Sequence, residues 1–486
     1  MTPAGTMNRP LRKVSVVVLL MFLALFVAST IIQYFQQGNL RSDGRNARAV
    51  YASFQTERGQ LLVDGEPIAY SAPSGDRYNY QRVYPGGAVY APVTGYFTIL
   101  PSAGGLEGEL NSYLSGDSDA QFLDRLNAIL TGRDPQGASV ELTIDPVVQQ
   151  AAWDALGDNT GSVVAIDPTT GAILALVSKP MYDPNALAVH DPDAVESTYD
   201  ALVADPGDPL IDRGISGDLN PPGSTFKLVV AAAALESGRY TADSVFPNPV
   251  SIDLPGTTTP ITNSADSNCG GADTASIATA LRLSCNIPFA QLAGELGDDV
   301  IREQAEKFGF GASFDIPMPS EPSVYPPTQS EAETWLTGFG QASVRASPLQ
   351  MAMVSAAIAN DGTLMRPTLV ESIVAPDLSI LESLQPQTFS SPLTAQNAEA
   401  LTRMMVDGVS NGVANNARIS GVEVAGKTGT AENGAGEPYT LWFTGFAPAD
   451  DPRVAVAVVL EDRQTGFGNL LAAPIARSVM EAVLSR

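Results

Sequence analysis

Three short motifs hold side chains that could transfer an acyl group, and the first is a Ser-x-x-Lys tetrapeptide at positions 224–227. It follows Pro-Pro-Gly and leads into the strongly helix-forming run LVVAAAALESG. This spacing predicts Ser224 in the first turn of a helix and Lys227 one turn further on the same face. A serine hydroxyl needs a base, and a neutral lysine amine could serve if burial or a neighbouring cation lowers its pKa. Taken alone, the motif is weak, and a solvated helix start would be its usual explanation.

The second and third motifs supply the other polar groups that such chemistry needs. Ser284 and Asn286 end the helical run TASIATALRL, where the bland interpretation is a polar helix terminus. Lys-Thr-Gly at 427–429 precedes Thr430, and a chance match is improbable in a chain with five lysines. Gly429 would allow a ligand to approach the strand backbone closely. Lys427 could lower the pKa of Lys227 and bind a carboxylate.

Composition excludes several other kinds of chemistry. The 486 residues include 53 acidic and 27 basic side chains, a formal net charge of −26, so phosphate-mediated binding of nucleic acid is not expected. One histidine and two cysteines cannot build a zinc site of several Cys and His ligands, and we expect neither metal nor cofactor. His190 lies in an ordinary polar stretch, so a histidine-dependent nucleophile is disfavoured.

The N-terminal segment predicts the compartment. An uncharged apolar run at 14–32 follows Arg9, Arg12 and Lys13 and is long enough to span a bilayer as a helix. We expect a cytoplasmic tail (1–13), an anchor (14–35) and one body outside the membrane. The alternative is a cleaved signal peptide, for which Val-Ala-Ser at 27–29 is a weak cut site.

Two cysteines outside the cell most simply form a disulfide. Cys269 and Cys285 are 16 positions apart, and an oxidising exterior favours their pairing. Two buried free thiols are the alternative that the sequence leaves open.

The elements that must position these motifs change in character near residue 138. Residues 36–137 are rich in Gly, Tyr and Arg, with strand-like pieces at 59–63, 77–84 and 95–100 and a helical pattern at 120–130. Beyond them the sequence predicts a strand (140–144), a helix (145–157), a hairpin (161–167 with 172–178), two late strands (440–448, 453–462) and a final helix (472–484). Antiparallel strands at both ends, with helices between, predict an α+β fold.

The order Ser-x-x-Lys, Ser-x-Asn, Lys-Thr-Gly resembles that of penicillin-binding proteins and serine β-lactamases. Segments 57–69, 82–96, 161–185 and 338–367 resemble class B penicillin-binding proteins, and the overall pattern looks most like the actinobacterial penicillin-binding protein A group. The resemblance implies a penicillin-binding transpeptidase / serine β-lactamase-like domain at 138–486. It also implies a β-rich dimerisation-like module at 36–137, called the pedestal below. The two cysteines resemble a pair found in that group.

The same resemblance implies roles for the residues of the first two motifs. Ser224 would be the acylated nucleophile and Lys227 its general base. Ser284 would relay a proton between the two lysines and the leaving amine. Asn286 would hold the backbone amide of the substrate and help to orient Lys227.

For the third motif, the resemblance implies substrate binding. Lys427 would set the electrostatics near Ser284, while Thr428 and Thr430 would bind the terminal carboxylate of the substrate beside Gly429. The backbone N–H groups of Ser224 and Thr430 would form an oxyanion hole.

These roles imply a D,D-transpeptidase that crosslinks peptidoglycan stem peptides, releases D-Ala and is acylated by β-lactams. A D,D-carboxypeptidase and a non-catalytic wall-synthesis scaffold are the alternatives. A β-lactamase is disfavoured because the Glu-x-x-Leu element at 333–336 is followed by Thr337, where class A β-lactamases have Asn. The resemblance also implies a membrane glycan polymerase as partner, since no glycosyltransferase is visible in this chain.

Overall fold

The structure is a computed structural model, and it describes residues 8–35, 51, 53–100, 103–132, 134, 136–217, 219–263, 267–434 and 436–486. Helix α1 (Asn8–Thr30) and a π-helical turn (Ile31–Phe35) form one rod whose side chains are exposed from residue 11 onward. Over Leu11–Phe35 the mean hydropathy is 2.8, and this is the one described helix long and apolar enough to cross a membrane. The predicted apolar span is therefore helical.

The pedestal is built on a six-stranded sheet that it shares with distant segments of the chain. The strand order is β13-β12-β4-β1-β2-β3, with β1 parallel to β4 and the other pairs antiparallel. The strands are β1 (Leu61–Val63), β2 (Glu66–Pro73), β3 (Tyr80–Val83), β4 (Ser139–Leu142), β12 (Val370–Val374) and β13 (Ile380–Ser383). Because this sheet crosses residue 138, the domain boundary near that position stays a prediction.

One predicted strand of the pedestal is wrong. Residues 95–100 form no ladder and make only an isolated bridge from Phe97 to Ala103. Their aromatic and β-branched residues favour a strand locally, yet a strand also requires a partner. Tyr96, Phe97 and Ile99 are instead buried in a cluster with residues of the 182–210 region. The apolar pattern of residues 95–100 thus predicted burial correctly, but their conformation is set by tertiary packing.

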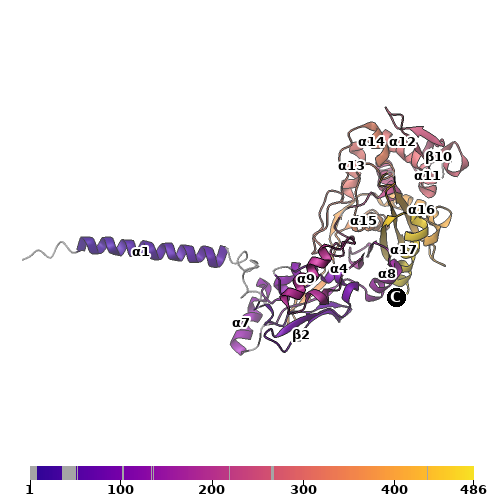
Figure 1. Cartoon of the computed structure of the whole chain (residues 1–486). Helices are drawn as coiled ribbons and strands as arrows, with labels where there is room; N and C mark the ends of the chain where they lie inside the picture. The colour runs from indigo at the N-terminus through magenta and orange to yellow at the C-terminus, as the bar shows by residue number, and fades with distance from the viewer. Residues whose placement is uncertain are drawn as a thin grey trace, which may run out of the picture.

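Short helices complete the pedestal, and α9 packs beside it (Figure 1). The pedestal helices are α4 (Ala91–Thr94), α5 (Gly105–Glu109), α6 (Asn111–Leu114) and α7 (Phe122–Thr131), and the neighbouring helix α9 spans Pro192–Val203. The predicted helix at 120–130 corresponds to α7.

The core of the larger domain is a five-stranded antiparallel sheet in the order β15-β16-β17-β5-β6. Helices α8 and α17 cover one face and α15 covers the other, while the buried helix α10 packs among α12, α13 and α16. The strands are β5 (Gly161–Ile166), β6 (Ile173–Lys179), β15 (Ala425–Ala431), β16 (Tyr439–Ala447) and β17 (Val454–Arg463). The helices are α8 (Pro146–Leu156), α10 (Lys227–Glu236), α15 (Pro348–Ala359) and α17 (Gly468–Leu484). Strands from both ends of the chain meet in one sheet, which confirms the predicted α+β fold.

The remaining helices and short strand pairs lie outside the five-stranded sheet, with α11, α12, α13, α14 and β10 at the end of the body opposite the pedestal (Figure 1). The helices are α11 (Ile277–Leu283), α12 (Asn286–Leu296), α13 (Asp298–Lys307), α14 (Glu331–Thr337) and α16 (Ala395–Ser410). The strands of this region are β7 (Val245–Pro247), β8 (Ser251–Asp253), β9 (Pro260–Thr262) and β10 (Thr274–Ser276), and β11 (Leu364–Met365) pairs with β14 (Thr388–Ser390). The three motifs lie where this region meets β15 and α10.

Candidate active site

Ser224 and Lys227 lie at the junction of two helical segments. Ser224 is half-buried in a 3₁₀ turn (Gly223–Phe226), and Lys227 is the first residue of α10. Side chains three apart in a 3₁₀ turn are eclipsed, so the two residues share a face as the spacing predicts. Residues 227–235 of α10 are all buried, because its Ala, Val and Leu side chains pack on every side. The chain therefore carries the Lys227 amine into a dry interior.

A close backbone contact supports the Ser224 turn. The amide of Gly223 donates to the carbonyl of Gly340 at 3.0 Å. Gly340 has φ of +73°, and a Cβ there would lie 2.0 Å from the Gly223 carbonyl oxygen. Any side chain at Gly340 would displace the turn, so a glycine is required at this position.

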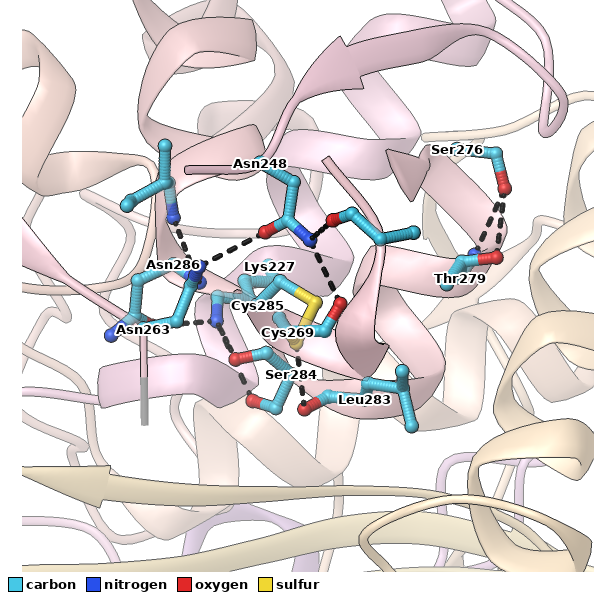
Figure 2. The surroundings of a disulfide bond; sticks show 12 residues. Lys227, Asn248, Asn263, Cys269, Ser276, Thr279, Leu283, Ser284, Cys285 and Asn286 are labelled. Carbon is cyan, nitrogen blue, oxygen red and sulfur yellow. Dashed lines mark hydrogen bonds between the residues drawn. A yellow bond between two sulfur atoms is a disulfide. The ribbon is translucent and has the colours of Figure 1, made fainter. Parts of the chain in front are cut away.

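Ser284 ends α11 in a left-handed conformation, and α12 begins two residues later. Its φ and ψ are 60° and 37°, an arrangement that costs a non-glycine residue of order 1–3 kcal/mol and is common at functional sites. Asn286 is the first residue of α12. The Ser-x-Asn motif is thus the sharp corner between two helices, and the corner turns both side chains toward Lys227 (Figure 2).

Lys427 extends from β15, the edge strand of the five-stranded sheet, where it is paired opposite Thr444. Its side chain is buried, and its Nζ donates to the Ser284 hydroxyl at 2.7 Å and to the Thr428 carbonyl at 2.8 Å. A Cβ at Gly429 would lie 2.9 Å from the Pro222 carbonyl. The close approach predicted at Gly429 is therefore made in the structure by the segment that carries Ser224.

The two threonines of this strand differ in their surroundings. Thr428 is buried. Thr430 is half-buried, and its hydroxyl accepts from the amide of Gly468, the first residue of α17, at 3.4 Å. Both stand beside the Ser224 turn, because Gly223 and Gly429 bring the two backbones together.

Lys227 makes its hydrogen bonds to the second motif. Its Nζ lies 2.8 Å from the Ser284 carbonyl, 3.4 Å from the Ser284 hydroxyl and 2.9 Å from Oδ1 of Asn286. Within the described part of the chain, no hydrogen bond joins Lys227 to the Ser224 hydroxyl. The Ser284 hydroxyl therefore lies between the amines of the two lysines. Catalytic hydrogen bonds commonly tighten only when substrate binds.

The electrostatics of the site favour neutral amines. Burial lowers the pKa of Lys227 well below its ordinary value, and the positive charge of Lys427 lowers it further. Burial alone lowers the pKa of Lys427 to about 7. Among the described residues, no carboxylate forms an ion pair with either lysine. Lys427 is thus the neighbouring cation that the sequence suggested, and burial is the larger cause.

The cysteines form a disulfide at the site itself. Cys285 is the middle residue of the Ser-x-Asn motif, and it is bonded to Cys269, with Cα atoms 5.7 Å apart. Cys269 opens a 3₁₀ turn (Cys269–Gly271) just before β10. The disulfide links the corner between α11 and α12 to the turn that precedes β10.

Three residues that hold the site together lie outside the three motifs, and the motifs do not predict them. Trp442 donates from Nε1 to the carbonyl of Pro221 at 2.9 Å and so fixes β16 to the segment before Ser224. Asn248 and Asn263 are buried beside the disulfide; Asn263 contacts the start of α12, and Asn248 contacts Asn263. Both lie in a stretch rich in Pro, Asn, Thr and Gly that resembles an ordinary loop.

Two residues weighed as alternatives lie outside the cluster. The Glu333 carboxylate accepts from the Gln329 amide and the Ser343 hydroxyl. The imidazole Nδ1 of His190 lies 2.7 Å from Asp76 in the pedestal. Neither contacts a residue of the three motifs, so neither supplies a base there.

Comparisons with known proteins agree with this arrangement. The family model described as the penicillin binding protein transpeptidase domain matches residues 161–481, and the one described as the penicillin binding protein A dimerisation domain matches residues 58–140. The first spans more than half of the chain. The chain therefore belongs to the penicillin-binding protein transpeptidase family, and with its pedestal it is a class B member, as the resemblance of segments 57–69 and 82–96 implies.

Individual relatives narrow the resemblance. Peptidoglycan D,D-transpeptidase PbpA from Mycolicibacterium smegmatis is 40% identical over 494 residues, covering 98% of this chain and 99% of the relative. PbpA from Mycobacterium tuberculosis is 40% identical over 490 residues, with the same coverage. Penicillin-binding protein A from M. tuberculosis, solved as a ceftriaxone acyl-enzyme complex, has a TM-score of 0.86 and 40% identity over 89% of this chain and 99% of that one. The predicted likeness to the penicillin-binding protein A group is confirmed.

Proposed function

We propose that this protein is a peptidoglycan D,D-transpeptidase that crosslinks stem peptides through an acyl-enzyme on Ser224 and is acylated by β-lactams at the same serine. The observation that carries the proposal is the convergence of two buried lysine amines on Ser284, with the Ser224 turn packed against β15. Its relatives named peptidoglycan D,D-transpeptidases, and a homologue captured as a ceftriaxone acyl-enzyme, support it.

In the acylation step, Ser224 would lose its proton to the neutral amine of Lys227 as its Oγ attacks the carbonyl of D-Ala-D-Ala. The lowered pKa of Lys227 keeps that amine unprotonated and able to accept. Backbone N–H groups of Ser224 and Thr430 would stabilise the oxyanion, an effect worth about 3–4 kcal/mol per donor. The C–N bond then breaks, and D-Ala leaves as an amine.

The departing amine needs a proton, and Ser284 is placed to deliver it. Its hydroxyl lies 2.7 Å from the Lys427 amine and 3.4 Å from the Lys227 amine. A proton gained by Lys227 could pass through Ser284 to the leaving nitrogen. In the second half-reaction the same path would run in reverse: it would take a proton from the acceptor amine of a second stem peptide as that amine displaces Ser224.

The edge position of β15 suits an extended peptide. Strand addition at a sheet edge binds a peptide through its backbone. Thr428 and Thr430 would receive the terminal carboxylate of the substrate, with Lys427 setting the electrostatics near Ser284. Asn286 would hold the backbone amide of the substrate from the opposite wall.

The first test is labelling of the detergent-solubilised full chain with a fluorescent penicillin, followed by intact-mass spectrometry. We expect a stable adduct on the wild type and none on Ser224→Ala. Ser237→Ala, at the other end of α10, is the matched control and should label normally. Rapid loss of the adduct with release of hydrolysed drug would indicate a hydrolase. Failure of the wild type to label would favour the scaffold alternative.

The second test separates transfer from hydrolysis. A pentapeptide stem ending in D-Ala-D-Ala is incubated with and without a large excess of an acceptor amine. We expect release of D-Ala to be accompanied by an amide-linked product when the amine is present. Hydrolysis alone at every amine concentration would identify a D,D-carboxypeptidase.

Membrane orientation and partnership are parts of the same proposal. The basic residues in the first turns of α1, Arg9, Arg12 and Lys13, would keep the N-terminus in the cytoplasm, with the pedestal (36–137) and the catalytic domain (138–486) outside. A membrane glycan polymerase would contact the anchor and the pedestal. Co-purification of the wild type, but not of a variant with an exchanged anchor, would support this partnership, and equal recovery of both would oppose it.

A further inference from the structure

Two buried asparagines, Asn248 and Asn263, connect the Ser-x-Asn corner to the segment that carries the disulfide (Figure 2). Their exposed fractions are 0% and 1%. Burying an amide without hydrogen-bond partners is costly. The hydrogen-bond partners of the two asparagines therefore show which parts of the chain these side chains hold in place.

Asn263 holds the start of α12. Its Oδ1 accepts from the backbone amides of Asn286 at 2.8 Å and Ile287 at 3.1 Å. The residue at the N-cap position is Cys285, whose side chain makes no capping hydrogen bond. Asn263 therefore caps this helix from a separate segment, a function that Asn or Ser usually performs from the N-cap itself.

Asn248 fixes which way the amide of Asn263 faces. Its Oδ1 accepts from Nδ2 of Asn263 at 2.9 Å, and its own Nδ2 donates to the carbonyls of Cys269 and Ala272, each at 2.8 Å. A rotated Asn263 amide would place oxygen against oxygen at Asn248 and nitrogen against the helix amides. The disulfide from Cys269 to Cys285 links the same two segments. The start of α12 is therefore held at two adjacent residues, by the disulfide at Cys285 and by Asn263 at Asn286.

The same segment also orients the side chain of Asn286. Nδ2 of Asn286 donates to the carbonyl of Thr262 at 3.1 Å, which leaves its Oδ1 facing Lys227 at 2.9 Å. Thr262 and Asn263 are neighbours at the end of β9. One dipeptide thus holds both the backbone and the amide group of Asn286.

We propose that Asn263, held by Asn248, is a positioning residue that orients Asn286, and through it Lys227, for acylation of Ser224. The inference rests on the proposed function, because it assigns Asn286 and Lys227 to that reaction. Asn263 acts on the reacting groups only through Asn286.

The test is a double-mutant cycle on the second-order rate constant for acylation by a fluorescent penicillin, measured on the full chain in detergent. We expect Asn263→Ala to lower that rate constant by about 10²-fold, the effect typical of a misplacement near 1 Å. In an Asn286→Ala background the same change should cost less than about threefold, because coupled residues are not additive. Asp191→Ala is the matched control: it removes a cap that accepts from two amides of α9 and should leave acylation unchanged.

Two further variants keep the test decisive if Asn263→Ala folds poorly. Asn263→Asp retains an acceptor for the two amides and should recover at least part of the rate. Asn248→Ala frees the amide of Asn263 to rotate and should give a smaller loss than Asn263→Ala. Full additivity with Asn286→Ala, or a loss below twofold in all three variants, would overturn the inference. Labelling of the wild type but not of Ser224→Ala in the same assay keeps either outcome separate from failure of the proposed function.

Discussion

The pedestal and the active site each bury cationic side chains, but they compensate the charge in opposite ways. In the pedestal, the Glu107 carboxylate lies between Arg58 and Arg82, with Nε to oxygen distances of 2.6 Å on both sides. All three side chains are almost completely buried. Arg58 also donates to the Glu107 carbonyl at 2.6 Å. The pedestal charge cluster, Arg58, Arg82 and Glu107, thus has a carboxylate for its guanidiniums.

The lysine pair, Lys227 and Lys427, has no such anion among the described residues. Its partners are a hydroxyl, an amide oxygen and backbone carbonyls, which bind an amine in either protonation state. The consequence is visible in the pKa values. Burial raises the pKa of Glu107, but the two guanidiniums outweigh it and the net pKa is lowered. Burial meets no opposing carboxylate at the lysines, and their pKa values fall.

The difference separates a structural use of buried charge from a chemical one. Paired ions stay charged and hold neighbouring segments in a fixed geometry. Unpaired amines give up the proton and become available as bases, at a cost in stability. Variants of the two clusters should therefore have opposite effects on stability and activity.

The largest expected effect is loss of acylation in Lys227→Met. Removing a general base typically lowers a rate by about 10²–10⁴-fold. Thermal stability should stay equal or rise, because the variant replaces a desolvated amine with an apolar side chain. Fluorescent penicillin labelling and a thermal melt of the same sample check both parts. Lys179→Met is the control, since that half-buried lysine binds carbonyls at 153 and 157 instead. Normal labelling of Lys227→Met would end the comparison.

Glu107→Gln should show the reverse pattern. It leaves two buried guanidiniums without an anion, and breaking a buried ion pair typically costs about 3–5 kcal/mol. We expect a lower urea midpoint but normal penicillin acylation per folded molecule. Glu399→Gln removes an ion pair whose side chains are 65% exposed, and its midpoint should hardly move. Equal midpoints for the two variants would contradict the structural role of Glu107.

The disulfide tests whether the lysine pair depends on outside support. Closing a loop of 16 residues is worth about 3 kcal/mol in the chain-entropy model. We expect Cys269→Ser with Cys285→Ser to lower the free energy of unfolding by up to that amount and to slow acylation, because the corner that carries Ser284 loses a tether. Stability lost without any change in acylation would show that the hydrogen bonds suffice.

The three motifs that converge in the structure could be found from the sequence, while the residues that hold them in place could not. Ser224, Lys227 and Lys427 were found because acyl transfer needs those residue types at short fixed spacings. The partners of Lys227 and the role of Asn263 depend on hydrogen bonds between segments far apart in the chain, which leave no periodic pattern.

The fold shows the same limit. Strands that are buried along most of their length, such as 161–166 and 454–463, were predicted close to their observed bounds. Residues 95–100 carry a similar pattern and form no strand, because no partner strand lies beside them. The two strands at 370–383 that extend the pedestal sheet were not predicted. The local hydrophobic pattern of a segment predicts its burial well but predicts poorly whether it pairs with another strand.

The last prediction is a pH dependence that distinguishes the two clusters by the pH range in which each one affects stability. Lys427 has a folded pKa of about 7 against an ordinary value of 10.5. Between these values the unfolded chain binds the proton and the folded chain does not, so stability rises with pH by up to about 1.4 kcal/mol per unit. Lys427→Met removes this contribution, and its urea midpoint should exceed that of the wild type at pH 7, with the gap closing toward pH 10.5.

For Glu107, whose pKa is lowered, the stabilisation is present at neutral pH and is lost only as pH falls below its ordinary value of 4.5. The stability of Glu107→Gln should therefore differ from that of the wild type by a constant amount above pH 7, and the two stabilities should converge in acid. Parallel curves for Lys427→Met between pH 7 and 10 would mean that Lys427 keeps its proton when folded. The neutral-amine interpretation of the lysine pair would then fail at Lys427 and rest on Lys227 alone.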